Sequence, residues 1–560
     1  MMKRVFLMLY NRSSGINEAA FLLAIFTFCS QILGLVRDRL LATYVGAGLE
    51  LDAYYAAFKI PDLLFVSIGT LASITVLLPM LNKKYEQGNE KVFQSYINQI
   101  FTVLFFFLIG VSFVLFIFMP ILVPMITPGF IGDQQDLVVM LARIMLVQPI
   151  IIGISGMFSS VTQFFKKFLI TALTPVMYNL GIIVGIIFLY PVFGIRGLAF
   201  GVVLGAFFHL LIQVPVLIHH KVLPKINFQI NWKEIRGLVS LSIPRTIGLS
   251  INTVTIIILT AFASRLGSGS IALFSLTQNM LNVPLAIIGV SYSVASFPLL
   301  VKYFNENNFD LFIKRIAEGA QKIIFFSLPV VFLFIVLRAQ IVRVVLGTNS
   351  FSWNDTRIAA ALLAVFIIGL VGQSLVQMFV RGMYAMGNTK KPLMVNISSQ
   401  IFVVICALFF LQLFTVPEVV IFIQNILRLQ GISDVRILAL PLAFALGNIL
   451  NCILLFTGYY TKFKKQYFSQ LITTTWQSFV ASIGVGAAAY NLLQIGSYFF
   501  DQNSFWGIFA QGFLAGIGGT VVGVVVLLLL KNQDIQDFVL VLRKKFWRAS
   551  IIQDTPEIRT

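Results

Sequence analysis

Long apolar runs dominate this chain of 560 residues and limit what it can fold into. We find about fourteen runs of 20 or more apolar residues, each long enough to cross a bilayer as a helix. The longest stretch between runs is about 20 residues, which is too short for a soluble domain. The chain is 58% hydrophobic and only 11% charged. These features predict an all-α polytopic membrane protein and exclude a catalytic domain outside the bilayer.

Lysine and arginine alternate between the two sets of loops. The chain has 40 of them and a net charge of +19. If the N-terminus is cytoplasmic, 28 lie in the even-numbered loops and the termini, seven in the odd-numbered loops and five in or beside the spans. The positive-inside rule then predicts that both termini are cytoplasmic. The positive charge therefore reflects topology and attraction to membrane lipids, and it does not support a nucleic-acid partner.

Several sequence features recur at an offset of about 218 residues. The matching features are Pro79 and Pro298, Lys84-Tyr85 and Lys302-Tyr303, Asp136 and Asp355, Gly153-x-Ser155 and Gly372-x-Ser374, and Pro175-x-x-x-Asn179 and Pro392-x-x-x-Asn396. Because the offset spans six helices, an even number, both copies have the same orientation in the membrane. We therefore predict two parallel six-helix lobes, residues 1–225 and 226–466, followed by residues 467–560 with two helices and a cytoplasmic tail.

The last two predicted spans lie outside this repeat and are rich in glycine. Their G-x-x-x-G spacings permit close approach of helices. Two interpretations remain open at this point. The glycines pack helices together, or they leave an apolar groove for a lipid tail.

Ionisable residues inside spans cost about 2.5 to 3.5 kcal/mol each on insertion scales, so those that persist indicate functional sites. In the first two spans they are Arg37, Asp38, Arg39, Asp52, Lys59 and Asp62. Arg143 in the fourth span and Arg245 in the seventh have no obvious acidic partner in their own spans. The resulting surplus of two positive charges suits an anionic head group such as a diphosphate, which arginine binds through two parallel hydrogen bonds.

Helical geometry separates the two arginines of the first span. Arg37 and Arg39 point about 200° apart on a helix. We expect Arg37 to line a cavity and Arg39 to extend to the outer interface. In the second span, Asp52, Lys59 and Asp62 lie on one stripe of an ideal helix, which a proline interrupts. The alternative is that these charges form ion pairs that only tie helices together.

Other chemistry is sparse. Cys29, Cys406 and Cys452 all fall inside apolar spans, which provides neither a disulfide framework nor a metal cluster. The sequence has no zinc-protease, P-loop or nucleophile-elbow motif. We therefore expect no enzymatic activity and no cofactor.

Five segments carry a resemblance to a known family. They are the run from Ser30 to Leu64 with GLVRDRL and GAGLELDAYYAAFKIPDLL, TPGF at 127–130, the run at 194–217, PRTIGL at 244–249 and RGMYAMGNTKKP at 381–392. Together they resemble the MurJ/MviN lipid II flippases of the multidrug/oligosaccharidyl-lipid/polysaccharide exporter superfamily. The resemblance implies a V-shaped, fourteen-helix transporter in the bacterial cytoplasmic membrane. Such a transporter moves undecaprenyl-diphosphate-linked peptidoglycan precursor from the inner to the outer leaflet.

The resemblance also implies functional residues and partners. It assigns roles to Arg37, Asp38, Asp52 and Lys59, and it implies a lipid-linked anionic substrate and membrane lipids as partners. The machinery of cell-wall synthesis is the candidate protein partner.

The chain departs from the family pattern where three arginines are replaced. The replacing residues are Gln31, Phe65-Val66 and Thr277-Gln278. We expect Lys59, Arg143 and Arg245 to supply the lost positive charge. Three alternatives remain: a flippase for another lipid-linked glycan, a cation-coupled drug exporter, which the surplus of cations disfavours, and a non-transporting membrane scaffold.

Overall fold

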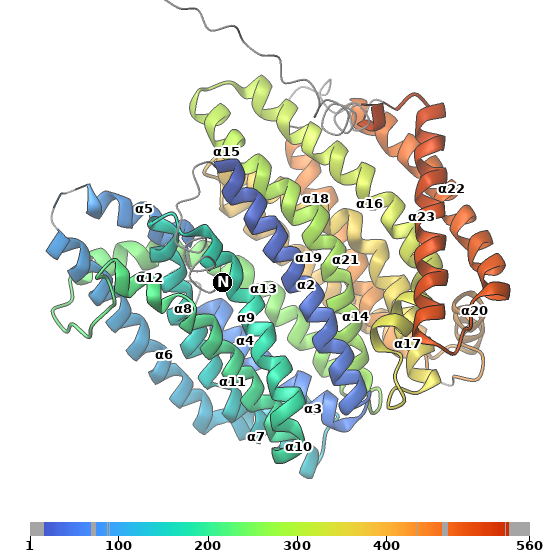
Figure 1. Ribbon diagram of the computed structural model, residues 1–560, viewed down its shortest axis with the longest axis horizontal. Coiled ribbons are helices and arrows are strands. Elements are labelled where there is room, and N and C mark those ends of the chain that lie inside the picture. Colours follow the sequence, from blue (N-terminus) through green and yellow to red (C-terminus); the bar gives the residue numbers. More distant parts are fainter. Residues whose placement is uncertain are drawn as a thin grey trace, which may run out of the picture.

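The computed structural model describes residues 16–68, 74–86, 88, 90–432, 434–461, 469–532 and 534–536, and the regular elements in these residues are all helices (Figure 1). Twelve helical segments are long and apolar enough to cross a membrane. The all-α polytopic class is therefore confirmed. The count of about fourteen stays a prediction, because the twelve do not include helix Ile16–Tyr44 of the first predicted span, and the second predicted span is broken into helices of only 9, 9 and 12 residues.

The helices up to residue 219, which we call the N-half, correspond to the first six predicted spans. They are α2 (Ile16–Tyr44), α3 (Leu49–Ala57), α4 (Lys59–Ser67), α5 (Ile74–Tyr85), α6 (Glu90–Ile126), α7 (Asp133–Met145), α8 (Val147–Phe164), α9 (Phe168–Val184), η2 (Gly185–Leu189), α10 (Tyr190–Phe193), α11 (Ile195–Leu211) and α12 (Val214–His219).

The helices of residues 232–460, which we call the C-half, correspond to the next six predicted spans. They are α13 (Trp232–Ala263), α14 (Ser270–Leu285), η3 (Ala286–Val290), α15 (Ser291–Asn305), α16 (Phe309–Leu346), α17 (Trp353–Phe366), η4 (Ile367–Gly369), α18 (Leu370–Ala385), α19 (Lys390–Leu413), α20 (Pro417–Leu427), η5 (Arg436–Leu438) and α21 (Ala439–Tyr460). Two further helices follow, α22 (Ser469–Phe499) and α23 (Phe505–Leu529).

The helix boundaries repeat at nearly the offset expected from the sequence. Helices α6 and α16 begin at residues 90 and 309, α7 and α17 at 133 and 353, and α9 and α19 at 168 and 390. The offset grows before α21, because the extra helix α20 lengthens the preceding connection. The repeat supports the parallel arrangement, while the lobe limits of 225 and 466 stay predictions.

The second predicted span is interrupted earlier than its proline indicated. Helix α3 ends at Ala57 and α4 begins at Lys59, so the break lies at Phe58. Pro61 lies in the first turn of α4, where a missing backbone N–H costs no helical hydrogen bond. The expected stripe of charges therefore spans two helices instead of one.

Glycines bring helices into close contact in two places. A Cβ atom on Gly185 in η2 would lie 2.2 Å from the Cα atom of Gly201 in α11, so no larger residue fits there. In α23, Gly519 packs in the same way against the backbone of Val485 in α22. Gly512 and Gly516 instead border an apolar hollow of about 410 Å³ between α23 and α16. The structure thus contains both close helix packing at glycines and an apolar hollow beside glycines. That a lipid tail occupies this hollow stays a prediction.

The two halves lie on opposite sides of the molecule, with α22 and α23 beyond the C-half (Figure 1). They contact each other where α14 packs against α2 and α3 and where α13 packs against α4 and α6. Toward the other end, α5 and α15 lie well apart (Figure 1). This arrangement places the charged end of α2 at the junction of the halves.

Candidate substrate-binding site

Arg37 and Asp38 form the centre of the candidate site. The Arg37 Nη2 and Nε atoms lie 2.8 and 3.0 Å from Asp38 Oδ1, and the Asp38 side chain is only 1% exposed. Asp38 Oδ2 accepts a second hydrogen bond from the Asn279 amide of α14, at 3.0 Å. A carboxylate of the N-half therefore binds both its own arginine and a side chain of the C-half.

An asparagine of α9 holds the other side of the arginine. Arg37 Nη1 donates to Asn179 Oδ1 at 3.1 Å, and the Asn179 amide donates to the Ser30 hydroxyl and to the carbonyl of Pro175. These bonds fix the guanidinium between α2 and α9 while leaving it 19% exposed. Three of the five guanidinium N–H groups are used in this way, and within the described residues the other two have no partner and can bind a ligand.

Asp52 binds the C-half through its backbone. Its carboxylate accepts hydrogen bonds from the backbone N–H groups of Gly269 and Ala272, at 2.6 and 2.7 Å, and is fully buried. These groups belong to the N-terminus of α14, where unpaired N–H groups and the helix dipole favour a negative charge. Asp52 is therefore an N-cap supplied from another part of the chain, and its contacts hold the two halves together.

Lys59 has a different environment from Asp52. It begins α4, is half-buried, and the carboxylate that interacts with its charge is Asp62. In the described part of the chain no hydrogen bond or ion pair within 4.0 Å is recorded for its ammonium group. Asp62 instead receives a hydrogen bond from Gln148 of α8. Lys59 is therefore a cation with spare binding capacity inside the N-half.

The other two cations predicted to bind the substrate are Arg143 and Arg245. Arg143 donates to the carbonyl of Phe116 at 3.0 Å and lies over that ring at 4.7 Å, so its recorded partners belong to α6 and not to the Arg37 cluster. Arg245 lies in α13, but its side chain falls outside the described residues. Roles for both residues in substrate binding stay predictions.

Arg39 points away from Arg37, as helical geometry predicted. That Arg39 extends to the outer interface stays a prediction. Its guanidinium donates to the carbonyl of Val344 in the last turn of α16 and lies 4.8 Å from the ring of Phe505 in α23. A carbonyl at a helix C-terminus attracts a cation, so Arg39 ties α2 to the C-half and to α23.

Further contacts close the same end of the molecule. The backbone N–H of Gly129 donates to the Ser264 hydroxyl at 3.1 Å, and Thr348 donates to the carbonyl of Ala42 at 3.1 Å. A Cβ atom on Gly46 would lie 2.5 Å from the carbonyl oxygen of Ser350. The halves are thus joined by hydroxyl–backbone hydrogen bonds and by a close backbone approach at the end where α2 finishes and α14 begins.

Sequence reasoning missed the neutral members of this site. Asn179 was noted only as part of the repeat, and Asn279 and Ser30 were not singled out. Amide side chains within apolar spans could have indicated them, because a buried amide needs hydrogen-bond partners. Among the described residues no group of three or more His, Cys, Asp or Glu side chains is placed to hold a metal ion.

Known proteins resemble this chain in sequence over most of its length. The family described as lipid II flippase MurJ matches residues 41–510. The chain belongs to the MurJ family. A probable lipid II flippase MurJ from Buchnera aphidicola (subsp. Acyrthosiphon pisum) is 29% identical over 377 residues, which cover 66% of this chain and 73% of that protein. The lipid II flippase MurJ of Burkholderia cenocepacia is 25% identical over 442 residues, covering 77% and 81%.

Solved structures show the same fold. A structure titled lipid II flippase MurJ, inward closed conformation, has a TM-score of 0.70 at 20% identity and covers 93% of this chain and all of that one. A multidrug resistance MATE family transporter of the MOP superfamily, in an inward-facing conformation, has a TM-score of 0.60 at 15% identity. The resemblance seen in the sequence motifs is therefore confirmed at the level of family and fold. This MurJ family member nevertheless lacks arginines at Gln31, Phe65-Val66 and Thr277-Gln278.

Proposed function

We propose that this chain moves lipid II, an undecaprenyl-diphosphate-linked peptidoglycan precursor, from the inner to the outer leaflet of the bacterial cytoplasmic membrane. The observation that carries the proposal is the position of Arg37. It is a charged, partly exposed group in α2, the first span predicted from the sequence, at the junction of two repeated halves of a MurJ family fold. A diphosphate cannot cross hydrocarbon unaided, so such a cationic site supplies the solvation that the lipid tails lack.

On this proposal, the structure represents a state in which the substrate site is closed toward the outer face of the membrane. The distribution of basic residues places the beginning of α2 inside and its end outside. The contacts of Asp52, Gly129 and Thr348 then lie at the outer face, while α5 and α15 diverge at the inner face (Figure 1).

Orientation can be tested directly by labelling. Single cysteines at Arg428 and Lys225, both exposed, are treated with an impermeant thiol reagent in intact cells after the three native cysteines are replaced. We expect the reagent to label position 428 and to spare position 225. Labelling only at 225 would reverse the assignment of the closed end.

Alternating access requires the outer contacts to break while the head group is bound. Hydrogen bonds to charged groups each contribute about 1.5 to 3 kcal/mol, so the Asp52 and Asp38 contacts form a barrier of useful size. A diphosphate on Arg37 competes with Asp38 for the same guanidinium. Opening then requires the Asp38–Asn279 and Asp52–α14 hydrogen bonds to break.

Lys59 is the first candidate to compensate for the missing arginines, because no direct partner is recorded for it in the described part of the chain. Arg143 and Arg245 are the further candidates, and Arg143 must turn away from Phe116 of α6 to contribute. The membrane potential, negative inside, favours outward movement of an anion by about 2.3 kcal/mol per charge per 100 mV. Transport of this substrate then needs no coupled cation.

Rescue of a bacterium depleted of its own lipid II flippase tests the proposal. We expect the parent gene to restore growth and Lys59→Ala to fail at unchanged protein level. Lys302→Ala is the matched control, because Lys302 is exposed at the end of α15. If a well-inserted parent does not restore growth, the replaced arginines favour a flippase for another lipid-linked glycan.

A further inference from the structure

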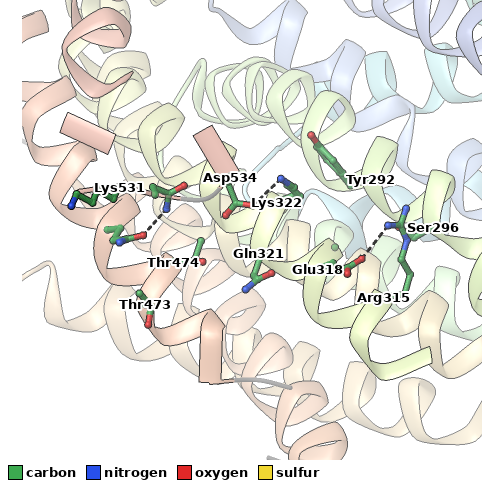
Figure 2. Close-up of a pocket in the computed structure, with 13 residues that line it drawn as sticks. Tyr292, Ser296, Arg315, Glu318, Gln321, Lys322, Thr473, Thr474, Lys531 and Asp534 are labelled. Carbon is green, nitrogen blue, oxygen red and sulfur yellow. Dashed lines mark hydrogen bonds and ion pairs between the residues drawn. The ribbon is translucent and has the colours of Figure 1, made fainter. Parts of the chain in front are cut away.

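A polar pocket lies between the C-half and the two helices that follow it, away from the junction of the two halves. It has a volume of about 640 Å³ and is bordered by α15, α16, α22 and the segment that follows α23 (Figure 2). This volume lies within the range of small-molecule sites, about 300 to 1,000 Å³. None of the helices that carry Arg37, Asp52 or Lys59 contributes to its lining.

One wall of the pocket is held in place by specific bonds. After α23, Leu530 accepts a hydrogen bond from Gln477 of α22, and Asn532 donates to the Gln477 side chain at 2.6 Å. Asp534 forms an ion pair with Lys322 of α16 at 2.8 Å, and Ile535 is 3% exposed. The segment is therefore packed against α16 and α22, and the pocket has a fixed shape.

The residues that line the pocket include one more cation than carboxylates. Arg315 pairs with Glu318 at 3.2 Å and Lys322 pairs with Asp534, so each carboxylate has a cationic partner (Figure 2). No partner is recorded within the described residues for Lys531, whose side chain is exposed. The pocket therefore has a surplus of one positive charge.

Several hydrogen-bond donors at the pocket are unused. Arg315 Nε is buried without a partner among the described residues. Ser296 and Thr474 also line the pocket, are only 3% and 6% exposed, and have no recorded hydrogen bond in the described part of the chain. A buried polar group without a partner costs about 1 to 3 kcal/mol, so a ligand that supplies acceptor oxygens is favoured here.

We propose that this pocket binds a phosphoryl group. A phosphoryl group carries negative charge and three acceptor oxygens, which match the surplus cation of Lys531 and the Thr474 hydroxyl on the same side of the pocket (Figure 2). The group comes either from the head group of a phospholipid or from a soluble phosphorylated molecule. The proposal goes beyond lipid II transport, because it concerns a site formed by other helices and its test measures binding alone.

Thermal unfolding of the purified full chain in detergent tests the site, since a ligand that binds the folded state raises the Tm. The probes are inorganic phosphate and dihexanoylphosphatidylglycerol, each against sodium chloride of equal ionic strength, with dihexanoylglycerol as the lipid that lacks phosphate. We expect a saturable rise in Tm with at least one phosphate-containing probe. Saturation by inorganic phosphate indicates a soluble ligand, whereas a response only to the phospholipid indicates a head group.

Variants localise the binding. Lys531→Gln should weaken the apparent affinity about tenfold, because one charge-assisted contact is lost. Thr474→Val removes a hydroxyl at nearly constant volume and should weaken it by a smaller factor, about threefold, even if the charge variant folds poorly. Lys302→Gln is the control, since it removes the same charge from an exposed site outside the pocket and should leave the affinity unchanged. Absence of any saturable response, or a response that Thr474→Val and Lys302→Gln alter equally, would overturn the proposal.

Discussion

Asn179 in the N-half and Asn396 in the C-half occupy equivalent places and bind different partners. Each ends a P-x-x-x-N motif, and each donates its amide to the first long helix of its own half, to Ser30 in α2 and to the carbonyl of Gly248 in α13. Asn179 Oδ1 accepts from the Arg37 guanidinium, whereas Asn396 Oδ1 accepts from the neutral amide of Asn451.

The helix arrangement thus repeats in the two halves, whereas the charge cluster around Arg37 lies in the N-half. Within the described residues, Arg37, Asp38, Lys59 and Asp62 belong to the N-half, and the C-half contributes Asn279 and backbone N–H groups. Substrate chemistry is thus expected to depend mainly on the N-half. Closure involves contacts between groups of both halves.

The largest expected effect comes from Arg37. Arg37→Ala leaves Asp38 buried without its cation, and breaking a buried pair costs about 3 to 5 kcal/mol. We expect complete loss of growth rescue for Arg37→Ala and strong loss for Arg37→Lys, which keeps the charge but cannot bind in a forked geometry. Arg39→Ala should retain most activity. Equal loss of membrane-inserted protein in Arg37→Lys and Arg39→Ala would instead support a purely structural role for the arginines.

The second effect compares the two asparagines. Asn179→Leu removes the acceptor that orients Arg37, so we expect transport to fall about tenfold, in line with the loss of one hydrogen bond to a charged group. Asn396→Leu breaks only neutral contacts and should stay within about threefold of the parent. Transport in proteoliposomes, normalised to inserted protein, measures both. Similar losses for the two variants would mean that the halves are functionally equivalent.

The third effect compares two helix caps. Asp52 caps α14 from the other half, whereas Ser352 and Asp355 cap α17 locally through a capping box. Loss of a cap costs about 1 kcal/mol, which corresponds to roughly a fivefold change in an equilibrium. Asp52→Asn should speed the labelling of a cysteine at Ala47 by an impermeant thiol reagent by up to that factor. Ser352→Ala should lower the Tm without changing the labelling rate, and a faster rate in that variant would contradict the assignment.

The smallest expected effect concerns the ion pair of Asp434 and Arg436. This pair belongs to the extended connection around α20, which has no counterpart among the described helices of the N-half. Partial burial raises the pKa of Asp434, but hydrogen bonds from Arg436 outweigh it and hold the pKa below its usual range. A depressed carboxyl pKa stabilises the fold at neutral pH, and this stabilisation is lost as the pH falls through the acidic range. The pair is partly exposed, so Arg436→Gln should lower the unfolding free energy by less than about 1 kcal/mol. Denaturant titration at pH 7 should show this difference, and at pH 3 the difference should be smaller.

Helical periodicity and the repeat predicted a large part of this molecule. The directions of Arg37 and Arg39 followed from about 100° per residue, because that geometry is a property of the single helix. The position of the break in the second span was predicted less accurately. Pro61 indicated a break, but the helix is interrupted at Phe58, since proline is tolerated in the first turn of the helix that follows.

The sequence by itself determined the membrane-crossing class, the parallel repeat and the family. These properties depend on the solvent that each segment can enter and on features a fixed distance apart along the chain. Only the tertiary structure decided that Asp52 caps α14, that Asn279 reaches Asp38, and that Arg39 binds the carbonyl of Val344. Each of these bonds joins residues more than 200 positions apart. A polar group buried in the membrane must find a partner, but which partner it finds depends on how the helices pack.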